Sequence, residues 1–178
     1  MRRVRRSTAC TWSWTVARPD KLSFGWEKLD LLLREPNLRD LLTAYWQELS
    51  PVKHIPLDID WAHFLQQEQA GIYRVWAARV NGTLAGFVSF YVRPWPYNRR
   101  VLVAIDGGHF LAPAFRATSS MVGIRMWRSA IAALKKEEVE LAFLHDNALR
   151  PLSPFLLAVG ARPMSSMWVV DLRHEDHD

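Results

Sequence analysis

The sequence has little of what several protein classes depend on. Its single cysteine, Cys10, excludes an internal disulfide and a cysteine-based zinc site. No apolar run reaches the length of a membrane span, and Ser, Thr and Trp interrupt residues 7–17 too often for the apolar region of a signal peptide. Internal repeats and low-complexity tracts are missing as well. We therefore expect a cytoplasmic protein that uses no membrane and no metal.

Positive charge is concentrated at the N-terminus. Residues 1–20 hold five arginines against Asp20 alone, which accounts for +4 of the formal net charge of +5 and leaves the rest of the chain near neutral. We expect a basic, flexible arm over residues 1–20, which is either a solvated tail or a contact for nucleic acid. With 178 residues, 49% of them apolar, the chain is long enough for one domain with a sizeable core, over residues 21–178.

Two kinds of hydrophobic periodicity alternate along the chain. Apolar residues at helical spacing predict four helices: residues 38–49, a second from an Asp58 or Asp60 cap to Gly71, residues 121–136 and residues 151–159. Aromatic and β-branched residues predict five strands: residues 72–80, 83–92, 101–112, 139–144 and 167–172. Asn81-Gly82 is the strongest short-range signal for a two-residue hairpin turn, here between the first two strands. The pattern predicts one mixed α/β domain.

Glycines and prolines mark two irregular places around the third predicted strand. Gly107-Gly108 interrupts the strand, which indicates a bulge or the close approach of another backbone or a ligand. Residues 94–100, with two prolines, read as a loop before the strand. Because loops over a rigid sheet commonly form substrate sites, Trp95 and Tyr97 are candidate pocket residues.

Several of these features together resemble the GNAT N-acyltransferases, most closely their phage-encoded members, over about residues 38–172. The residues that carry the resemblance are Gly71, Asn81-Gly82, Pro94 with Tyr97, Asp106, Phe110 to Arg116, and Leu157 to Pro163. The resemblance implies an α/β (α+β) fold with a mixed, mostly antiparallel sheet of seven strands, flanked by about four helices. It also implies a splay between the fourth and fifth strands, with acyl-coenzyme A in the gap.

The run from strand to helix is the candidate site for the coenzyme. The pyrophosphate loop of the family falls on residues 116–121, where Ser119 and Met121 replace the usual small residues. Backbone N–H groups at a helix N-terminus bind phosphate. The residues expected to bind coenzyme A are Phe110, Leu111, Arg116, Ala117, Thr118, Ser119, Ser120, Met121 and Gly123. The alternative is an ordinary strand-to-helix turn capped by Ser119 or Ser120.

Acyl transfer to an amine requires a base for the ammonium proton and an acid for the departing thiolate. Asp106, a carboxylate in an apolar strand beside two glycines, is the first candidate for the base, and His109 and His145 are alternatives. His145 is also a candidate pocket residue. The position at which many family members carry an acid tyrosine holds Leu156, so Tyr73, Tyr91, Tyr97 or solvent would have to act instead.

The sequence thus predicts an enzyme that moves an acetyl or similar group from acetyl-coenzyme A to a primary amine. The acceptor is either a small molecule or a macromolecule, and the protein is a monomer or a homodimer in a bacterium or a phage-infected host. Two other functions stay open. One is a binding or regulatory module on a degenerate scaffold, and the other is a phage protein that binds or modifies nucleic acid through the arginine arm.

Overall fold

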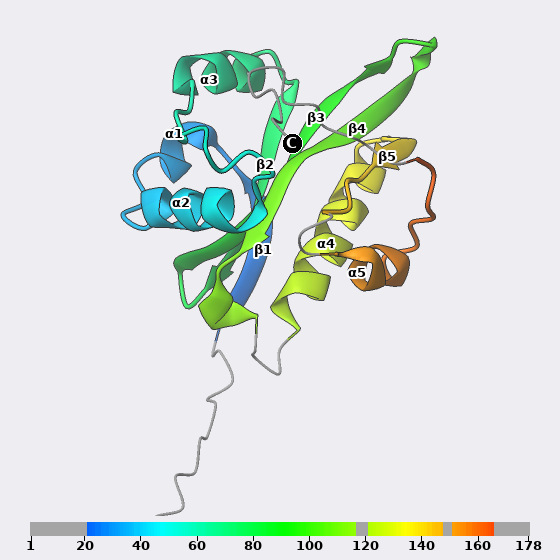
Figure 1. Ribbon diagram of the computed structural model, residues 1–178. Helices are drawn as coiled ribbons and strands as arrows, with labels where there is room; N and C mark the ends of the chain where they lie inside the picture. Colours follow the sequence, from blue (N-terminus) through cyan, green and yellow to red (C-terminus); the bar gives the residue numbers. More distant parts are fainter. Residues whose placement is uncertain (1–20, 117–120, 148–150, 166–178) are drawn as a thin grey trace, which may run out of the picture.

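One five-stranded sheet organises the part of the chain that the computed structural model describes, residues 21–116, 121–147 and 151–165 (Figure 1). The strands lie in chain order and are β1 Leu22–Glu27, β2 Tyr73–Val80, β3 Thr83–Trp95, β4 Asn98–Leu111 and β5 Leu141–Phe143. The first four strands pair antiparallel, and β5 pairs with β4 in parallel. A parallel pair needs a crossover connection, and here a helix supplies it.

Helices cover both faces of the sheet. The five α-helices of the described residues are α1 Leu29–Leu32, α2 Leu38–Leu49, α3 Trp61–Gln69, α4 Val122–Lys136 and α5 Ser153–Ala158, and a 3-10 turn spans Pro113–Phe115. Figure 1 shows α1, α2 and α3 on one face and α4 and α5 on the other. Buried clusters fill both interfaces, with Phe90 and Trp127 on the α4 face and Phe87 and Phe110 on the α2 face.

Local signals account for most of these elements. In the hairpin turn, Asn81 (φ 51°) and Gly82 (φ 84°) both have positive φ, as a two-residue turn of this kind requires. The Asp60 side chain caps α3 by accepting the His63 N–H at 2.9 Å. The predicted helix over residues 38–49 is confirmed to the residue.

Several predictions about the sheet need correction. The predicted loop over residues 94–100 is wrong, because β3 continues to Trp95 and β4 begins at Asn98. Strand β1 and helix α1 were not predicted. Seven strands are not confirmed: the described residues form five, and the predicted strand over residues 167–172 lies outside them. The described helices number five rather than about four.

A bulge and a short pairing shape the second half of β4. Ser89 pairs with Gly108 and Phe90 with Asp106, so Gly107 is the extra residue of the predicted bulge, which is confirmed. A Cβ atom on Gly107 would lie 2.9 Å from Tyr91 Cε2, so a side chain does not fit there. Pairing with β5 covers only residues 103–105. From Asp106 onward, β4 therefore has no partner strand on that side within the described chain, and a gap opens there.

Candidate functional site

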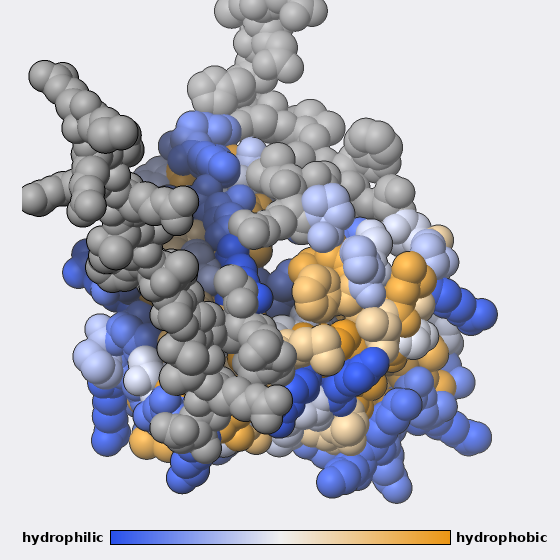
Figure 2. Space-filling view, turned by 90° about the horizontal axis from the view of Figure 1, so that it is seen from below, coloured by the Kyte–Doolittle hydropathy of each residue, from blue (hydrophilic) through white to orange (hydrophobic). Residues whose placement is uncertain are grey.

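A pocket of about 620 Å³ lies where β4 loses its pairing with β5. Its walls are the end of β4, the first half of α4, α5 and the C-terminal end of α2. The lining residues are Glu48, Leu49, His109, Phe110, Leu111, Arg116, Met121, Val122, Gly123, Ile124, Met126, Trp127, Arg128, Pro151, Leu152, Pro154, Phe155 and Ala158. Figure 2 shows hydrophobic residues gathered in the region of α4 and α5. The walls are mostly apolar, with the few polar groups that a ligand site needs.

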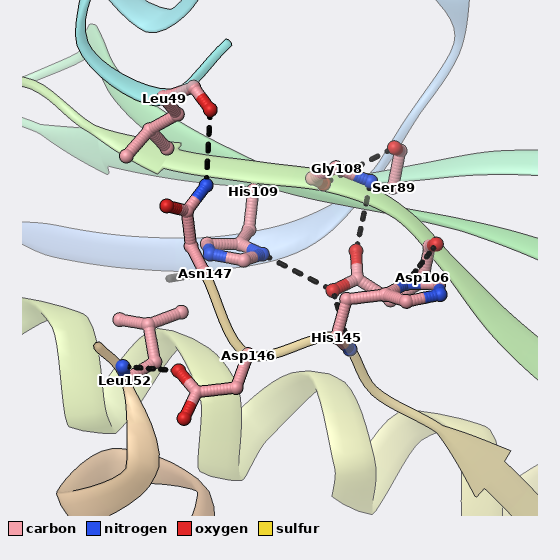
Figure 3. Close-up of polar contacts among 9 residues, drawn as sticks. All are labelled: Leu49, Ser89, Asp106, Gly108, His109, His145, Asp146, Asn147 and Leu152. Carbon is pink, nitrogen blue, oxygen red and sulfur yellow. Dashed lines mark hydrogen bonds and ion pairs between the residues drawn. The ribbon is translucent and has the colours of Figure 1, made fainter. Parts of the chain in front are cut away.

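Asp106 is buried at the bulge, and its side chain is 1% exposed. Its Oδ1 accepts the Gly108 N–H at 2.8 Å, and its Oδ2 lies 3.1 Å from His109 Nδ1. The His145 N–H also donates to Oδ2, at 3.5 Å. Figure 3 shows the carboxylate between β4 and the segment that follows β5. Asp106 is therefore satisfied by its neighbours, and it does not line the pocket.

His109 connects this buried carboxylate to the pocket. Residues three apart in a regular strand point to opposite faces, but the extra residue at Gly107 brings His109 to the side of Asp106. The His109 side chain is 12% exposed and lines the pocket, with its ring centroid 5.3 Å from that of Trp127 on α4. Of the two residues predicted to be catalytic, His109 is the one that a ligand in the pocket can reach.

The segment after β5 packs along the other side of the bulge. His145 Nδ1 lies 3.1 Å from the Asp106 carbonyl oxygen, and Asn147 Nδ2 donates to the Leu49 carbonyl at 3.0 Å (Figure 3). Asp146 accepts the Leu152 N–H at 2.5 Å and the Ser153 hydroxyl. Desolvation acts to raise the pKa of Asp146, but these hydrogen bonds and the nearby His109 hold it below its ordinary value.

Neutral tyrosines approach the bulge from the α2 face. Burial raises the pKa of Tyr73 to about 12, against a lowering hydrogen bond from Ser89. Burial and the negative charge of Asp106 also raise the pKa of Tyr45. A Cβ atom on Gly108 would lie 3.0 Å from the Tyr45 hydroxyl oxygen, so this glycine leaves room for the ring. Tyr45 was not predicted as a site residue, and its helical spacing in the sequence indicates only a core position.

Arg116, predicted to bind phosphate, is held by the protein itself. Its Nη1 and Nη2 donate to the two Glu48 carboxylate oxygens at 2.7 and 2.9 Å, and its Nε donates to the Leu111 carbonyl at 2.6 Å. Its guanidinium carbon lies 4.9 Å from the Phe110 ring centroid. Arg116 thus joins the end of α2 to the end of β4. Glu48 was not predicted, since no local pattern links residues so far apart in sequence.

The N-terminus of α4 faces the pocket. Met121 is its N-cap residue, with φ 48° and no side-chain oxygen to accept a hydrogen bond. The first helical hydrogen bond runs from the Arg125 N–H to the Met121 carbonyl at 3.0 Å, so the N–H groups of Val122, Gly123 and Ile124 precede it. The predicted residues Ala117, Thr118, Ser119 and Ser120, and the alternative of a Ser119 or Ser120 cap, lie outside the described residues.

The structure brings most of the predicted site residues together, but not all. Phe110, Leu111, Met121 and Gly123 line the pocket beside His109. Trp95 and Tyr97, predicted as pocket residues, do not line it. They lie at the tip of the β3–β4 hairpin because both strands continue past the body of the sheet. Within the described residues, no helix is long and apolar enough to cross a membrane, and no group of three metal-ligating side chains occurs.

Known structures resemble this architecture. No protein-family model and no curated protein matches the chain. The structure of a ribosomal-protein-alanine N-acetyltransferase from Brucella melitensis biovar Abortus 2308 matches with a TM-score of 0.62 and 20% identity, over 85% of this chain and 99% of that one. This chain has the fold of the GNAT acetyltransferases.

Two further matches support the GNAT fold. A predicted acetyltransferase from Clostridium acetobutylicum, solved with acetyl-CoA, has a TM-score of 0.58 and 14% identity, over 88% of this chain and 100% of that one. The aminoglycoside N-acetyltransferase AAC(6')-Iy, solved with CoA, has a TM-score of 0.61 and 17% identity, over 89% and 99%. The predicted resemblance to GNAT proteins is confirmed for the fold, while its closeness to phage-encoded members is not supported.

Proposed function

We propose that the protein transfers an acetyl group from acetyl-coenzyme A to a primary amine. The observation that carries this proposal is the Asp106–His109 pair, which opens onto an apolar pocket in the gap beyond the β4–β5 pairing of a GNAT fold. Fold alone does not establish a reaction, so the argument rests on what these side chains can do.

The pocket residues fit acetyl-coenzyme A, which supplies an activated acetyl thioester when it binds. The apolar walls suit the pantetheine arm, and the N–H groups of Val122, Gly123 and Ile124, which precede the first helical hydrogen bond, suit the pyrophosphate. Arg128, which also lines the pocket, offers a positive charge. The Arg116 guanidinium donates to Glu48 and to the Leu111 carbonyl, so in this proposal its side chain joins α2 to β4, and its predicted part in coenzyme binding stays a prediction.

His109 acts as the base in this proposal, and Asp106 orients it. With its Nδ1–H directed at Asp106 Oδ2, the imidazole leaves Nε2 as the proton acceptor. The amine nitrogen forms a bond to the acetyl carbonyl carbon, and the carbon–sulfur bond breaks. The proton leaving nitrogen passes to Nε2 and then to water, while the departing thiolate takes a proton from water. This replaces Asp106, the first candidate for the base, with a residue that the pocket exposes.

The charged residues of the pocket limit which amines are suitable acceptors. Glu48 is the only carboxylate among the described lining residues, and Arg116 is paired with it. Some structural neighbours act on aminoglycosides, which are polycations. A polycation requires several uncompensated acidic groups, and these lining residues do not supply them. Because the amine has to reach His109, which lines the same pocket as the donor, we favour an acceptor that presents one amine on a neutral or apolar body.

A binding module without catalysis is the second candidate, and one observation favours it. Leu156 of α5 occupies the position at which many GNAT proteins carry the acid tyrosine, and its side chain cannot donate a proton. Such a module would bind coenzyme A in the same pocket and would not turn it over.

One experiment tests both functions. The protein is melted with and without acetyl-coenzyme A, and thiol release is measured with a panel of small primary amines and peptide N-termini. Ligand at a hundred times its Kd adds about 2.7 kcal/mol, which raises the melting temperature by roughly 5 to 10 °C in a domain of this size. His109→Ala should keep this shift and lose thiol release, whereas His63→Ala, an exposed histidine on α3, should keep both.

The outcomes separate the two candidates. A thermal shift without thiol release from any amine supports the binding module. Without a shift at millimolar ligand, both candidates fail. Thiol release that His109→Ala leaves intact retains the transferase but removes His109 as its base.

A further inference from the structure

Beyond the body of the sheet, β3 and β4 continue as a two-stranded ribbon. Pro94 pairs with Leu102 and Trp95 with Asn98, but the β2 register ends at Tyr91 and the β5 register begins at Val103. Figure 1 shows the ribbon projecting away from the helices. Because a two-stranded hairpin in water is only marginally stable, a ribbon that contributes nothing to the core is a structural cost to the protein.

The ribbon is strongly basic. Its sequence from Arg93 to Arg100 is Arg-Pro-Trp-Pro-Tyr-Asn-Arg-Arg, and no carboxylate occurs between Arg93 and Ile105. Arg93, Arg99 and Arg100 are all exposed, and no ion pair within the described residues involves them. The arginines of the ribbon thus present positive charge that the described structure does not neutralise.

An aromatic pair occupies the tip. Tyr97 is 88% exposed, and its ring meets that of Trp95 edge to face, with centroids 5.5 Å apart and an interplanar angle of 76°. A tyrosine so exposed has no role in the core. Pro94 and Pro96 restrict the backbone on both sides of Trp95, so the segment that carries the two rings is restricted before any partner binds.

We propose that the ribbon, residues 93–100, binds single-stranded nucleic acid. Exposed rings stack on unpaired bases, and arginine side chains contact the phosphates between them, which matches the alternation of rings and arginines here. An acidic protein would account for the arginines but not for the exposed ring. The near end of the ribbon, Arg100, lies about six residues, or roughly 20 Å, from Asp106 along β4, so the inference does not depend on the proposed acetyl transfer.

The test uses the full chain and fluorescence anisotropy with a labelled oligonucleotide of about 20 unpaired residues, beside a duplex of equal length. Tyr97→Ala should weaken single-strand binding by roughly five- to 150-fold. For three phosphate contacts on a single strand, the slope of log affinity against log salt concentration is about −2. Arg99→Glu with Arg100→Glu removes two of these contacts, so the slope should become less steep by about 1.4. Arg39→Glu with Lys53→Glu is the control, since it changes the charge equally at exposed positions elsewhere.

Four results would overturn the proposal. The first is no binding at low salt. The second is binding that the ribbon variants and the control pair weaken equally. The third is duplex binding as tight as single-strand binding with no loss on Tyr97→Ala. The fourth is capture of poly-glutamate that depends on Arg99 and Arg100 but not on Tyr97, which would assign the ribbon to an acidic protein. Unchanged melting temperatures for the exposed ribbon variants exclude unfolding as the cause of lost binding.

Discussion

Replacement of Asp106 by asparagine tests the proposed catalytic role of the Asp106–His109 pair most directly. The two carboxylate oxygens have separate duties, since Oδ1 accepts the Gly108 N–H at 2.8 Å and Oδ2 faces His109 Nδ1 at 3.1 Å. Asparagine has one acceptor oxygen and one NH₂ donor. With its oxygen kept by Gly108, its NH₂ group gives up the long contact with the His145 N–H (3.5 Å), faces Nδ1 and favours the imidazole tautomer with the proton on Nε2. That tautomer cannot accept a proton from the amine.

The expected magnitude follows from the role of a general base, which contributes about 10²- to 10⁴-fold to a rate. Asp106→Asn should therefore lower kcat by about that factor, equivalent to about 3 to 5 kcal/mol of barrier. The affinity for acetyl-coenzyme A should not change, because the Asp106 side chain is 1% exposed and does not line the pocket. Initial rates of thiol release at saturating donor give kcat, and thermal melting with the donor gives affinity.

The double variant provides the control. Because the two residues act as a unit, adding Asp106→Asn to His109→Ala should cost little beyond the single change. A kcat for Asp106→Asn within about threefold of the natural protein, over a pH range of about 6 to 9, would refute the pairing as a catalytic device.

Three further predictions concern stability, measured by urea unfolding. Gly86→Ala should lower the free energy of unfolding by about 1 to 3 kcal/mol, because the new Cβ would lie 2.4 Å from a β4 carbonyl oxygen. Gly25→Ala is the control: its Cβ would have no atom within 4 Å, so the change should be neutral or slightly stabilising. Glu48→Gln should cost about 1 to 2 kcal/mol in the same assay, since it removes the charge that holds the half-buried Arg116. Burial raises the pKa of Tyr73 from 10.0 to about 12, so the stabilisation that depends on its neutral form is full below pH 10 and is lost as the pH rises toward 12. Tyr73→Phe should make the free energy of unfolding fall less steeply between pH 10 and about 12. An unchanged slope would contradict the raised pKa of Tyr73.

Short-range signals predicted the parts of the fold that depend on backbone conformation. Asn81-Gly82 and Gly107-Gly108 were read correctly as a turn and a bulge, because few other residues adopt such backbone conformations or leave such space. The same reasoning failed at residues 94–100, where prolines suggested a loop although β3 holds Pro94 in a two-stranded ribbon and only Pro96 lies in the turn. Strand β1, with Gly25 in its middle, is stabilised by pairing with β2, which local propensity does not show.

The site was predicted as separate residues rather than as an arrangement. Asp106 and His109 were both named, but only the bulge places them on one side, with Asp106 buried behind His109 and His109 lining the pocket. The Glu48–Arg116 pair joins residues 68 positions apart, and Tyr45 reaches Gly108 of β4 from the same helix as Glu48, α2. Contacts of this kind depend on tertiary packing, which hydrophobic periodicity and motif spacing in the sequence do not reveal.

The short pairing of β4 with β5 also determines which side of the pocket unfolds locally most easily. On its β3 side, β4 belongs to a long antiparallel ladder, whereas the segment after β5 is attached by individual side-chain hydrogen bonds, such as that from Asn147 to Leu49. Proteins open locally where few buried contacts are lost. Amide hydrogens after β5 should exchange well before those of β3 and β4, so the pocket can widen on its α5 side while His109 keeps its place in the sheet.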